Sequence, residues 1–176
     1  MRGSIAFIGS GGQGILFAAQ LVAETMFRRG LYVAQLQSYG AEVRGGSVLA
    51  YVVFDESPIE DPYVYRHTVA IALHEIGLRR WRKHAEGSSI VVYDSDLVKN
   101  PASGWIPAPI SRRCFELGIH GSENVVATAI ALSAVDPSLI DALRDVVANR
   151  PRAEQNLRAI DLGTEIAREL GLQRSH

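Results

Sequence analysis

Four glycines within six positions make the segment "GSGGQG", at residues 9–14, the strongest constraint on how this chain folds. A strand-like run at 3–9 leads into it, and from 12 to 29 apolar residues recur with helical spacing. Glycine lets the backbone adopt conformations that other residues avoid, and it lets a second group approach closely. The segment therefore predicts a tight strand-to-helix turn with something packed against its backbone.

Strand-like and helix-like segments alternate through the first part of the chain, and helical patterns fill the rest. This order predicts an α/β layered fold with a mostly parallel sheet and a helical C-terminal part, in one domain over residues 1–176. The helical crossover after the first strand predicts that the first two strands pair in parallel. The predicted strands are 3–9, 31–37, 47–54, 68–73, 88–94 and a short edge strand at 104–110. The predicted helices are 12–29, 74–85, 111–117, 122–135, 137–148 and 152–170.

Composition argues against several kinds of function. The formal net charge of −1 provides no electrostatic basis for binding nucleic acid or a membrane surface. One cysteine, Cys114, is too few for a disulfide within the chain or for a four-thiolate cluster. The five histidines show no metal-ligand spacing, so neither a metal site nor a catalytic residue is predicted. No apolar run is long enough to cross a membrane and no signal peptide is evident, so we expect a cytoplasmic protein.

The glycine-rich segment has the pattern of an anion-binding turn. Gly9, Gly11 and Gly14 match G-x-G-x-x-G between a strand and a helix, where free N–H groups and the helix dipole favour a phosphate. A dinucleotide site also needs an acidic residue at the end of the second strand, and this chain has Gln35 and Gln37 there. A phosphate-bearing ligand other than NAD is therefore favoured, and the alternative is that the glycines only tighten the turn.

A second loop rich in glycine, "SYGAEVRGG" at 38–46, follows the second predicted strand. Loops at the carboxyl ends of strands gather at one edge of a parallel sheet, so we expect this loop beside the first. Arg44 carries a planar fork suited to phosphate or carboxylate, and Tyr39 can stack or donate a hydrogen bond. Glu42 has the alternative role of holding Arg44 in place.

The two loops together resemble a known family. "GSGGQG" followed by "SYGAEVRGGS" is similar to the gamma subunit of the 2-oxoacid:ferredoxin (acceptor) oxidoreductases, which include pyruvate, 2-oxoglutarate, ketoisovalerate and indolepyruvate enzymes. The resemblance continues in "IVVYDSDLV" (90–98), in "IPAPISRRCFELG" (106–118) and in the apolar helix that begins near Asn124. Two segments depart from the family: "YRHTVAIA" stands where an acidic stretch is usual, and "SENVVATAIAL" differs from the usual helix start.

This resemblance implies a subunit of an enzyme that oxidatively decarboxylates a 2-oxoacid to an acyl-CoA and passes the electrons to ferredoxin. It implies a Rossmann-like gamma-type domain that packs against thiamine-binding alpha and beta subunits and a ferredoxin-like subunit, and that helps to form the coenzyme A site. Thiamine diphosphate and iron–sulfur clusters then belong to other chains, because this one lacks a "GDG" motif and has a single cysteine. The chain is not expected to be active alone.

The resemblance also implies a ligand-binding role for the two loops. Gln13 is interpreted as an amide donor and acceptor at the tip of the first loop, or else as a helix residue turned to solvent. Two functions of other classes stay open: an independent NAD(P)-linked oxidoreductase, and a stand-alone nucleotide- or coenzyme A-binding module. The implied cofactor-binding residues are Gly9, Gly11, Gly12, Gln13, Gly14, Tyr39, Gly40, Glu42, Arg44, Gly45 and Gly46.

Two further features have more than one interpretation. Cys114 lies beside Arg112 and Arg113, whose charge would make a thiol reactive, but it also fits a small packed core residue. The basic run "RRWRKH" at 79–84 is interpreted as a solvated helix face or as a surface that docks onto an acidic partner subunit.

Overall fold

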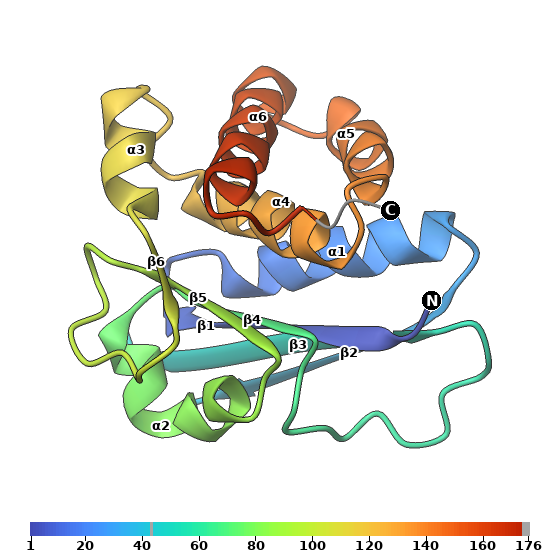
Figure 1. Ribbon diagram of the computed structural model, residues 1–176, viewed down its shortest axis with the longest axis horizontal. Helices are drawn as coiled ribbons and strands as arrows, with labels where there is room; N and C mark the ends of the chain where they lie inside the picture. The colour runs from blue at the N-terminus through green and yellow to red at the C-terminus, as the bar shows by residue number, and fades with distance from the viewer. Residues whose placement is uncertain (43, 174–176) are drawn as a thin grey trace.

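A six-stranded sheet covered by helices on both faces is formed by the part of the chain that the computed structural model describes, residues 1–42 and 44–173 (Figure 1). The strand order across this sheet is β2-β3-β1-β4-β5-β6. The strands are β1 (Gly3–Ser10), β2 (Tyr32–Tyr39), β3 (Ser47–Asp55), β4 (Val69–Ala72), β5 (Ile90–Asp94) and β6 (Ile106–Ala108). The helices are α1 (Ile15–Arg28), α2 (Glu75–Glu86), α3 (Ile110–Glu116), α4 (Glu123–Val135), α5 (Leu139–Ala148) and α6 (Ala153–Glu169).

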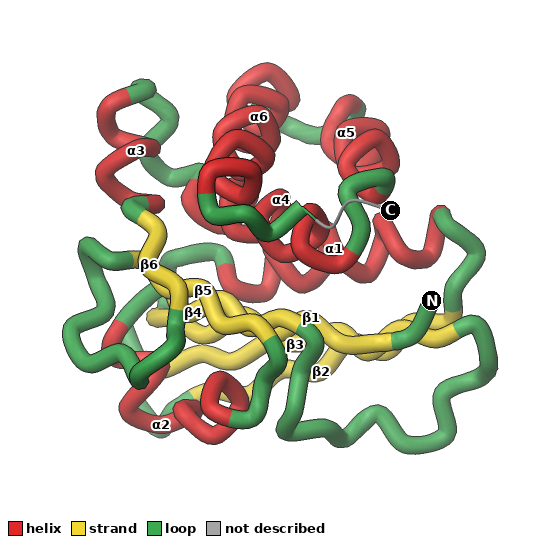
Figure 2. The backbone as a smooth tube through the Cα atoms, viewed as in Figure 1, coloured by secondary structure: helices red, strands yellow, loops and turns green. Residues whose placement is uncertain are grey.

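The two faces of the sheet carry different covers (Figure 2). On the first face, α1 lies across β1, β2 and β3, α4 packs against α1 and β4, and α5 and α6 pack outside these two helices. On the second face, α2 packs against β1, β3 and β4. The long connection between β3 and β4 passes on the side of this second face (Figure 2).

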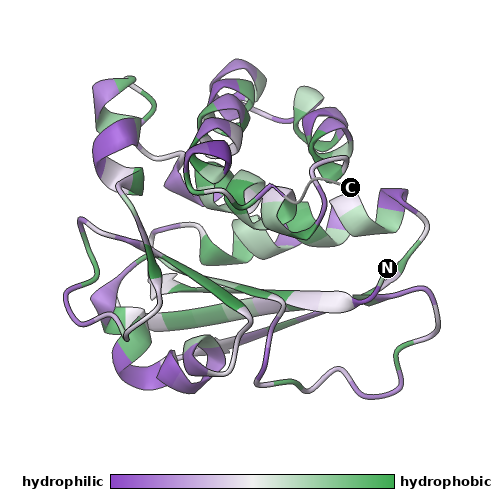
Figure 3. Ribbon diagram, viewed as in Figure 1, coloured by the Kyte–Doolittle hydropathy of each residue, from purple (hydrophilic) through white to green (hydrophobic). Residues whose placement is uncertain are grey.

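Each face has a hydrophobic core of its own. The core of the first face joins the sheet to α1 and to the C-terminal helices. Within it α4 is buried from Asn124 to Ala134, as expected for a helix that is apolar nearly all round, and it lies between α1 and the outer helices (Figure 3). The core of the second face is smaller and includes Leu49, Tyr51 and Leu78. Because apolar burial is the main stabilising contribution, the first face carries most of the stability.

The predicted α/β fold with a mostly parallel sheet is confirmed, but one predicted pairing is wrong. β1 and β2 do not pair, because β3 lies between them and runs antiparallel to both. The pairings of β1 with β4, β4 with β5 and β5 with β6 are parallel, which makes three of the five pairings in the described sheet parallel. β3 follows β2 after a short loop, so a hairpin costs little loop-closure entropy and fills the place beside β1.

The edge strand predicted at 104–110 is β6, which pairs with β5 alone. Pro107 lies in its middle, where an edge position tolerates the missing N–H donor. No helix within the described ranges is long and apolar enough to cross a membrane.

Candidate functional site

Two loops meet at one edge of the sheet and form the candidate site. The glycine loop (residues 9–14) follows β1, and the hairpin loop (residues 40–46, described except for Val43) joins β2 to β3. Ser10 pairs with Ser47 at the ends of β1 and β3, and the Gly11 N–H donates to the Gly46 carbonyl at 2.8 Å. The expectation that the loops lie side by side is therefore confirmed, although the antiparallel strand β3 is what joins them.

The protein's own chain occupies the space beside two of the glycines. A Cβ atom on Gly9 would lie 2.5 Å from Oε1 of Gln13 and 2.5 Å from Cδ1 of Ile15. Gly14 precedes α1 in the left-handed conformation (φ +71°), and a Cβ there would overlap the Asn124 side chain. A Cβ atom on Gly12, where φ is +90°, would have no heavy atom of a described residue within 4 Å beyond its chain neighbours. Gly9 and Gly14 therefore tighten the turn, and Gly12 leaves open space that a ligand can approach.

Gln13 turns inward rather than to solvent. Its Oε1 accepts a hydrogen bond from the Ser10 N–H at 2.9 Å, and its Nε2 donates to the Leu73 carbonyl at 3.2 Å. The side chain thereby joins the end of β1 to the residue that follows β4. The solvent-facing interpretation is wrong, and the amide serves the shape of the loop.

Replacing Gln13 by glutamate should expose this role. The carboxylate keeps the acceptor for Ser10 but places an oxygen against the Leu73 carbonyl, so we expect the free energy of unfolding to fall by about 1–3 kcal/mol. Urea denaturation at pH 7.5 measures it. Gln20→Glu on the exposed side of α1 is the matched control and should change stability by less than about 0.5 kcal/mol. Equal effects of the two substitutions would contradict the assigned role.

The hairpin loop carries one cationic side chain, Arg44. Among the described residues, Arg44 has no ion-pair partner, and it is exposed. The Glu42 side chain lies instead over Gly40 and Gly46, where added Cβ atoms would meet its carboxylate. Glu42 therefore does not hold Arg44 in place through an ion pair among the described residues. Tyr39, 56% exposed, completes the outer surface of this loop.

The start of α1 adds hydrogen-bond donors to the same edge. The first bond of its ladder runs from the Ala18 N–H to the Gly14 carbonyl, which leaves the earlier N–H groups of the first turn without helical acceptors. No acidic side chain lies in that turn, and no side chain caps it. Free N–H groups, the positive end of the helix dipole and the Arg44 guanidinium together make this edge suited to an anion.

Asn124 is a residue of this edge that the sequence did not identify. It is 8% exposed at the start of α4, and its Nδ2 donates to the Gly14 carbonyl at 3.3 Å. The only sequence signal for it is a lone amide at the head of an apolar helix. It fixes the turn between the glycine loop and α1.

Cys114 is a packed core residue. It is fully buried, and burial raises the pKa of its thiol to about 12, with the charges of Glu123 and Asp94 acting in the same direction. The neighbouring Arg113 pairs with Glu165 at 3.3 Å and with Glu169 at 3.1 Å. The reactive-thiol interpretation is wrong for this environment. Within residues 1–42 and 44–173, no group of three or more potential ligand side chains is placed to hold a metal ion.

Comparison with known proteins assigns the chain to a family. The family model described as pyruvate ferredoxin/flavodoxin oxidoreductase matches residues 4–166, nearly the whole chain. The chain belongs to this family. The 2-oxoglutarate synthase subunit KorC of Archaeoglobus fulgidus is 30% identical over 169 residues, which cover 95% of this chain and 89% of that protein.

Solved structures of two 2-oxoacid:ferredoxin oxidoreductases share the fold. The gamma subunit of keto/oxoacid ferredoxin oxidoreductase from Geobacter sulfurreducens has a TM-score of 0.75 at 26% identity, covering 94% of this chain and 98% of that one. The 2-oxoglutarate:ferredoxin oxidoreductase of Magnetococcus marinus has a TM-score of 0.82 at 23% identity over 97% of this chain and 32% of that one. The resemblance to gamma subunits of 2-oxoacid:ferredoxin oxidoreductases is confirmed.

Proposed function

We propose that this chain is the gamma subunit of a multi-subunit 2-oxoacid:ferredoxin oxidoreductase, and that the edge formed by its two loops binds the phosphates of coenzyme A. The observation that carries the proposal is the Gly11–Gly46 hydrogen bond, which joins the free donors of α1 to the unpaired Arg44. Family membership supports the oxidoreductase part of the proposal. The Magnetococcus enzyme, whose structure is described with coenzyme A and succinyl-CoA bound, supports the coenzyme part.

The residues of the edge divide the task of holding the coenzyme. Arg44 pairs with a phosphate through its planar fork, and the first-turn N–H groups of α1 donate to a phosphate beside it. Gly12 and Gly45, both with positive φ, allow the ligand to reach the backbone. Gln13 and Glu42 act indirectly, because their side chains shape the loops. When bound, coenzyme A supplies the thiol that accepts the acyl group.

Thiamine diphosphate and iron–sulfur clusters are proposed to lie on partner chains. The only cysteine, Cys114, is buried in the core and is not placed to bind iron. The partners proposed are the thiamine-binding alpha and beta subunits and a ferredoxin-like subunit, with ferredoxin as acceptor. An NAD(P)-linked enzyme is disfavoured, because Gln35 and Gln37 occupy the strand where an acidic ribose ligand is needed.

Arg44→Ala tests the proposal in the reconstituted complex. We expect normal folding and assembly and a rise of about tenfold or more in the KM for coenzyme A, because one charge-assisted hydrogen-bond partner is lost. Arg28→Ala, a cation at the other end of α1, is the matched control and should leave this KM unchanged. An unchanged KM in Arg44→Ala with intact assembly would refute the coenzyme role. If the chain purified from its native source carried no partner chains and bound coenzyme A tightly, the stand-alone module would be favoured instead.

A further inference from the structure

A pocket lies away from the candidate site, on the second face of the sheet. It encloses about 560 Å³ between β2, β3, α2 and the connection that leads to β4. Its floor includes Leu36 and Leu49, and its aromatic lining is Tyr51, Tyr63, Tyr65, Trp81 and His84. None of the residues that line it is acidic. The proposed function does not use this pocket.

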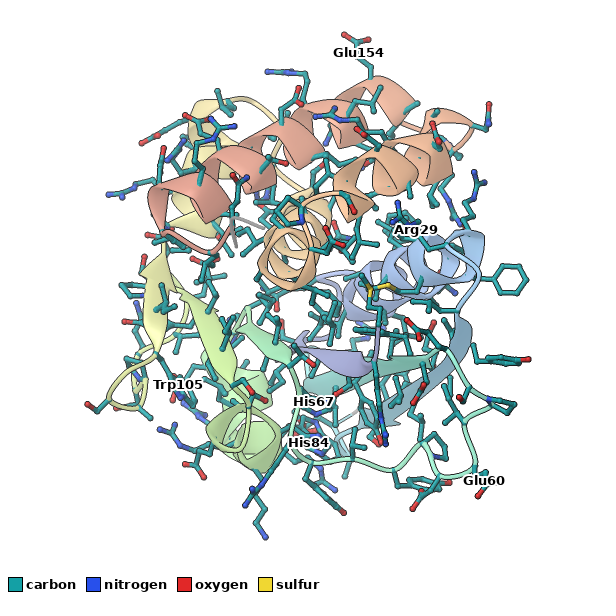
Figure 4. The ribbon with its side chains drawn as sticks, turned by 45° about the vertical axis from the view of Figure 1, so that its right-hand side comes forward. Arg29, Glu60, His67, His84, Trp105 and Glu154 are labelled. Carbon is teal, nitrogen blue, oxygen red and sulfur yellow. The ribbon has the colours of Figure 1, made fainter. Side chains whose placement is uncertain are left out.

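His84 brings an unpaired ring nitrogen to this pocket. The residue is 6% exposed on α2, and its Nδ1 lies 2.9 Å from Nε2 of His67 (Figure 4). His67 Nδ1 in turn lies 3.0 Å from the Ser4 hydroxyl, which donates to the Arg66 carbonyl at 3.5 Å. Since Ser4 donates outward, this chain of hydrogen bonds makes each Nδ1 a donor and leaves Nε2 of His84 as an acceptor. No described residue bonds to that Nε2.

Aromatic rings surround the imidazole of His84. The ring centres of Tyr65 and Tyr51 lie 5.0 Å and 5.6 Å from it, and Trp81 approaches edge-on at 6.4 Å. The indole N–H of Trp81 is buried and has no hydrogen-bond partner. The pocket therefore combines aromatic surfaces with one free acceptor, the Nε2 atom of His84.

One exposed arginine, Arg80, lies next to a residue that lines the pocket. The guanidinium carbon of Arg80 lies 5.1 Å from the centre of the Trp81 ring. α2 is kinked at Trp81, between Arg80 and His84, so the contact with the Trp81 ring is what places Arg80 beside the pocket. A ligand that stacks beside Trp81 would place a negatively charged substituent within reach of Arg80.

We propose that this pocket binds a purine nucleotide. An adenine ring offers a flat surface for stacking on the aromatic lining, and its exocyclic amino group carries an N–H donor that complements the acceptor at His84 Nε2. Its phosphate pairs with Arg80. The site is separate from the loop edge and does not depend on the coenzyme A proposal, although the adenine end of coenzyme A has the same chemistry.

Titration of the full chain with AMP tests the proposal. Binding is monitored by calorimetry and by tryptophan fluorescence. The fluorescence is measured in a Trp105→Phe variant, so that Trp81 is the only tryptophan that reports. We expect saturable binding with quenching of Trp81. Ribose 5-phosphate, which lacks the base, should bind at least tenfold more weakly. Absence of AMP binding, or equal affinity for ribose 5-phosphate, would overturn the proposal.

Substitutions locate the bound base. Tyr65→Ala should weaken AMP binding about tenfold or more, whereas Tyr32→Ala, an exposed tyrosine of β2 outside the pocket, should not change it. His84→Asn, whose shorter amide reaches only the Nδ1 position, should lose more affinity than His84→Gln, whose amide oxygen can accept a hydrogen bond near the Nε2 position. AMP binding that depends on Arg44 and not on Tyr65 would place the nucleotide on the loop edge and overturn the proposal.

The source of the base is decided by competition. If coenzyme A displaces AMP in the parent chain and binds more weakly after Tyr65→Ala, the pocket takes the adenine end of the coenzyme. If AMP binds and coenzyme A does not displace it, the ligand is a free nucleotide. Both results support a purine site, and both are distinct from the KM change expected for Arg44→Ala.

Discussion

Replacing Gly77 by alanine should destabilise the protein by about 3 kcal/mol, because the added methyl group has no space. Gly77 lies on α2 directly beneath the end of β1, and a Cβ there would lie 2.5 Å from the Gly9 carbonyl oxygen and 2.6 Å from the Gly9 nitrogen. The obstructing atoms are backbone in the middle of the fold, so α2 must move away from the sheet. In a helix, glycine to alanine is otherwise stabilising by about 1 kcal/mol, so the sign of the change separates the two effects.

Gly11→Ala is the matched control for this substitution. A Cβ on Gly11 would lie 3.4 Å from the nearest atom, the Gly45 nitrogen, which is an ordinary contact distance. We expect its free energy of unfolding to stay within about 1 kcal/mol of the parent value. Urea denaturation of both variants measures the difference. A Gly77→Ala protein as stable as the parent would show that α2 is not seated against β1 as described.

Acidification from pH 7 to pH 5 should destabilise the protein through its buried histidine pair. Burial lowers the pKa of His67 to about 3, and the neighbouring His84 acts in the same direction. Burial also lowers the pKa of His84. Unfolding restores ordinary values near 6.5, so below that pH the unfolded state binds protons that the folded state excludes. His67 alone then contributes a loss of about 2 kcal/mol at pH 5.

Asp94 contributes to the pH dependence with the opposite sign. Burial raises the pKa of Asp94 above its ordinary 3.8, even though hydrogen bonds from Ser111 oppose the shift. Its protonation on further acidification therefore favours the folded state, which is the opposite sign. Urea denaturation at half-unit steps of pH gives the slope. His67→Gln should flatten it, and His120→Gln, which removes an exposed histidine, should not. A parent protein equally stable at pH 7 and pH 5 would contradict the buried pair.

The short-range features of this protein were predictable from its sequence. The strand before the glycine loop, the helix after it and the buried helix α4 all follow from the spacing of apolar residues along a few turns of chain. The two loops also identified the family. Their glycines stand at fixed positions within short segments, because each one meets a local backbone requirement, so the motif can be found in the sequence alone. Such patterns persist in one dimension, so they can be read without knowing which segments meet.

The contacts that shape the sites required the tertiary structure. β3 lies between β1 and β2 because it is the strand that pairs with both of them. The spacing of residues along the chain does not predict which strand pairs with which. Gln13 reaches Leu73, Gly77 receives the backbone of Gly9, and His84 meets His67, each across a long stretch of chain. The sequence determined the local conformations and the family. Only packing determined what the glycines accommodate and which polar atoms are left without partners, because both depend on neighbours that are distant in sequence.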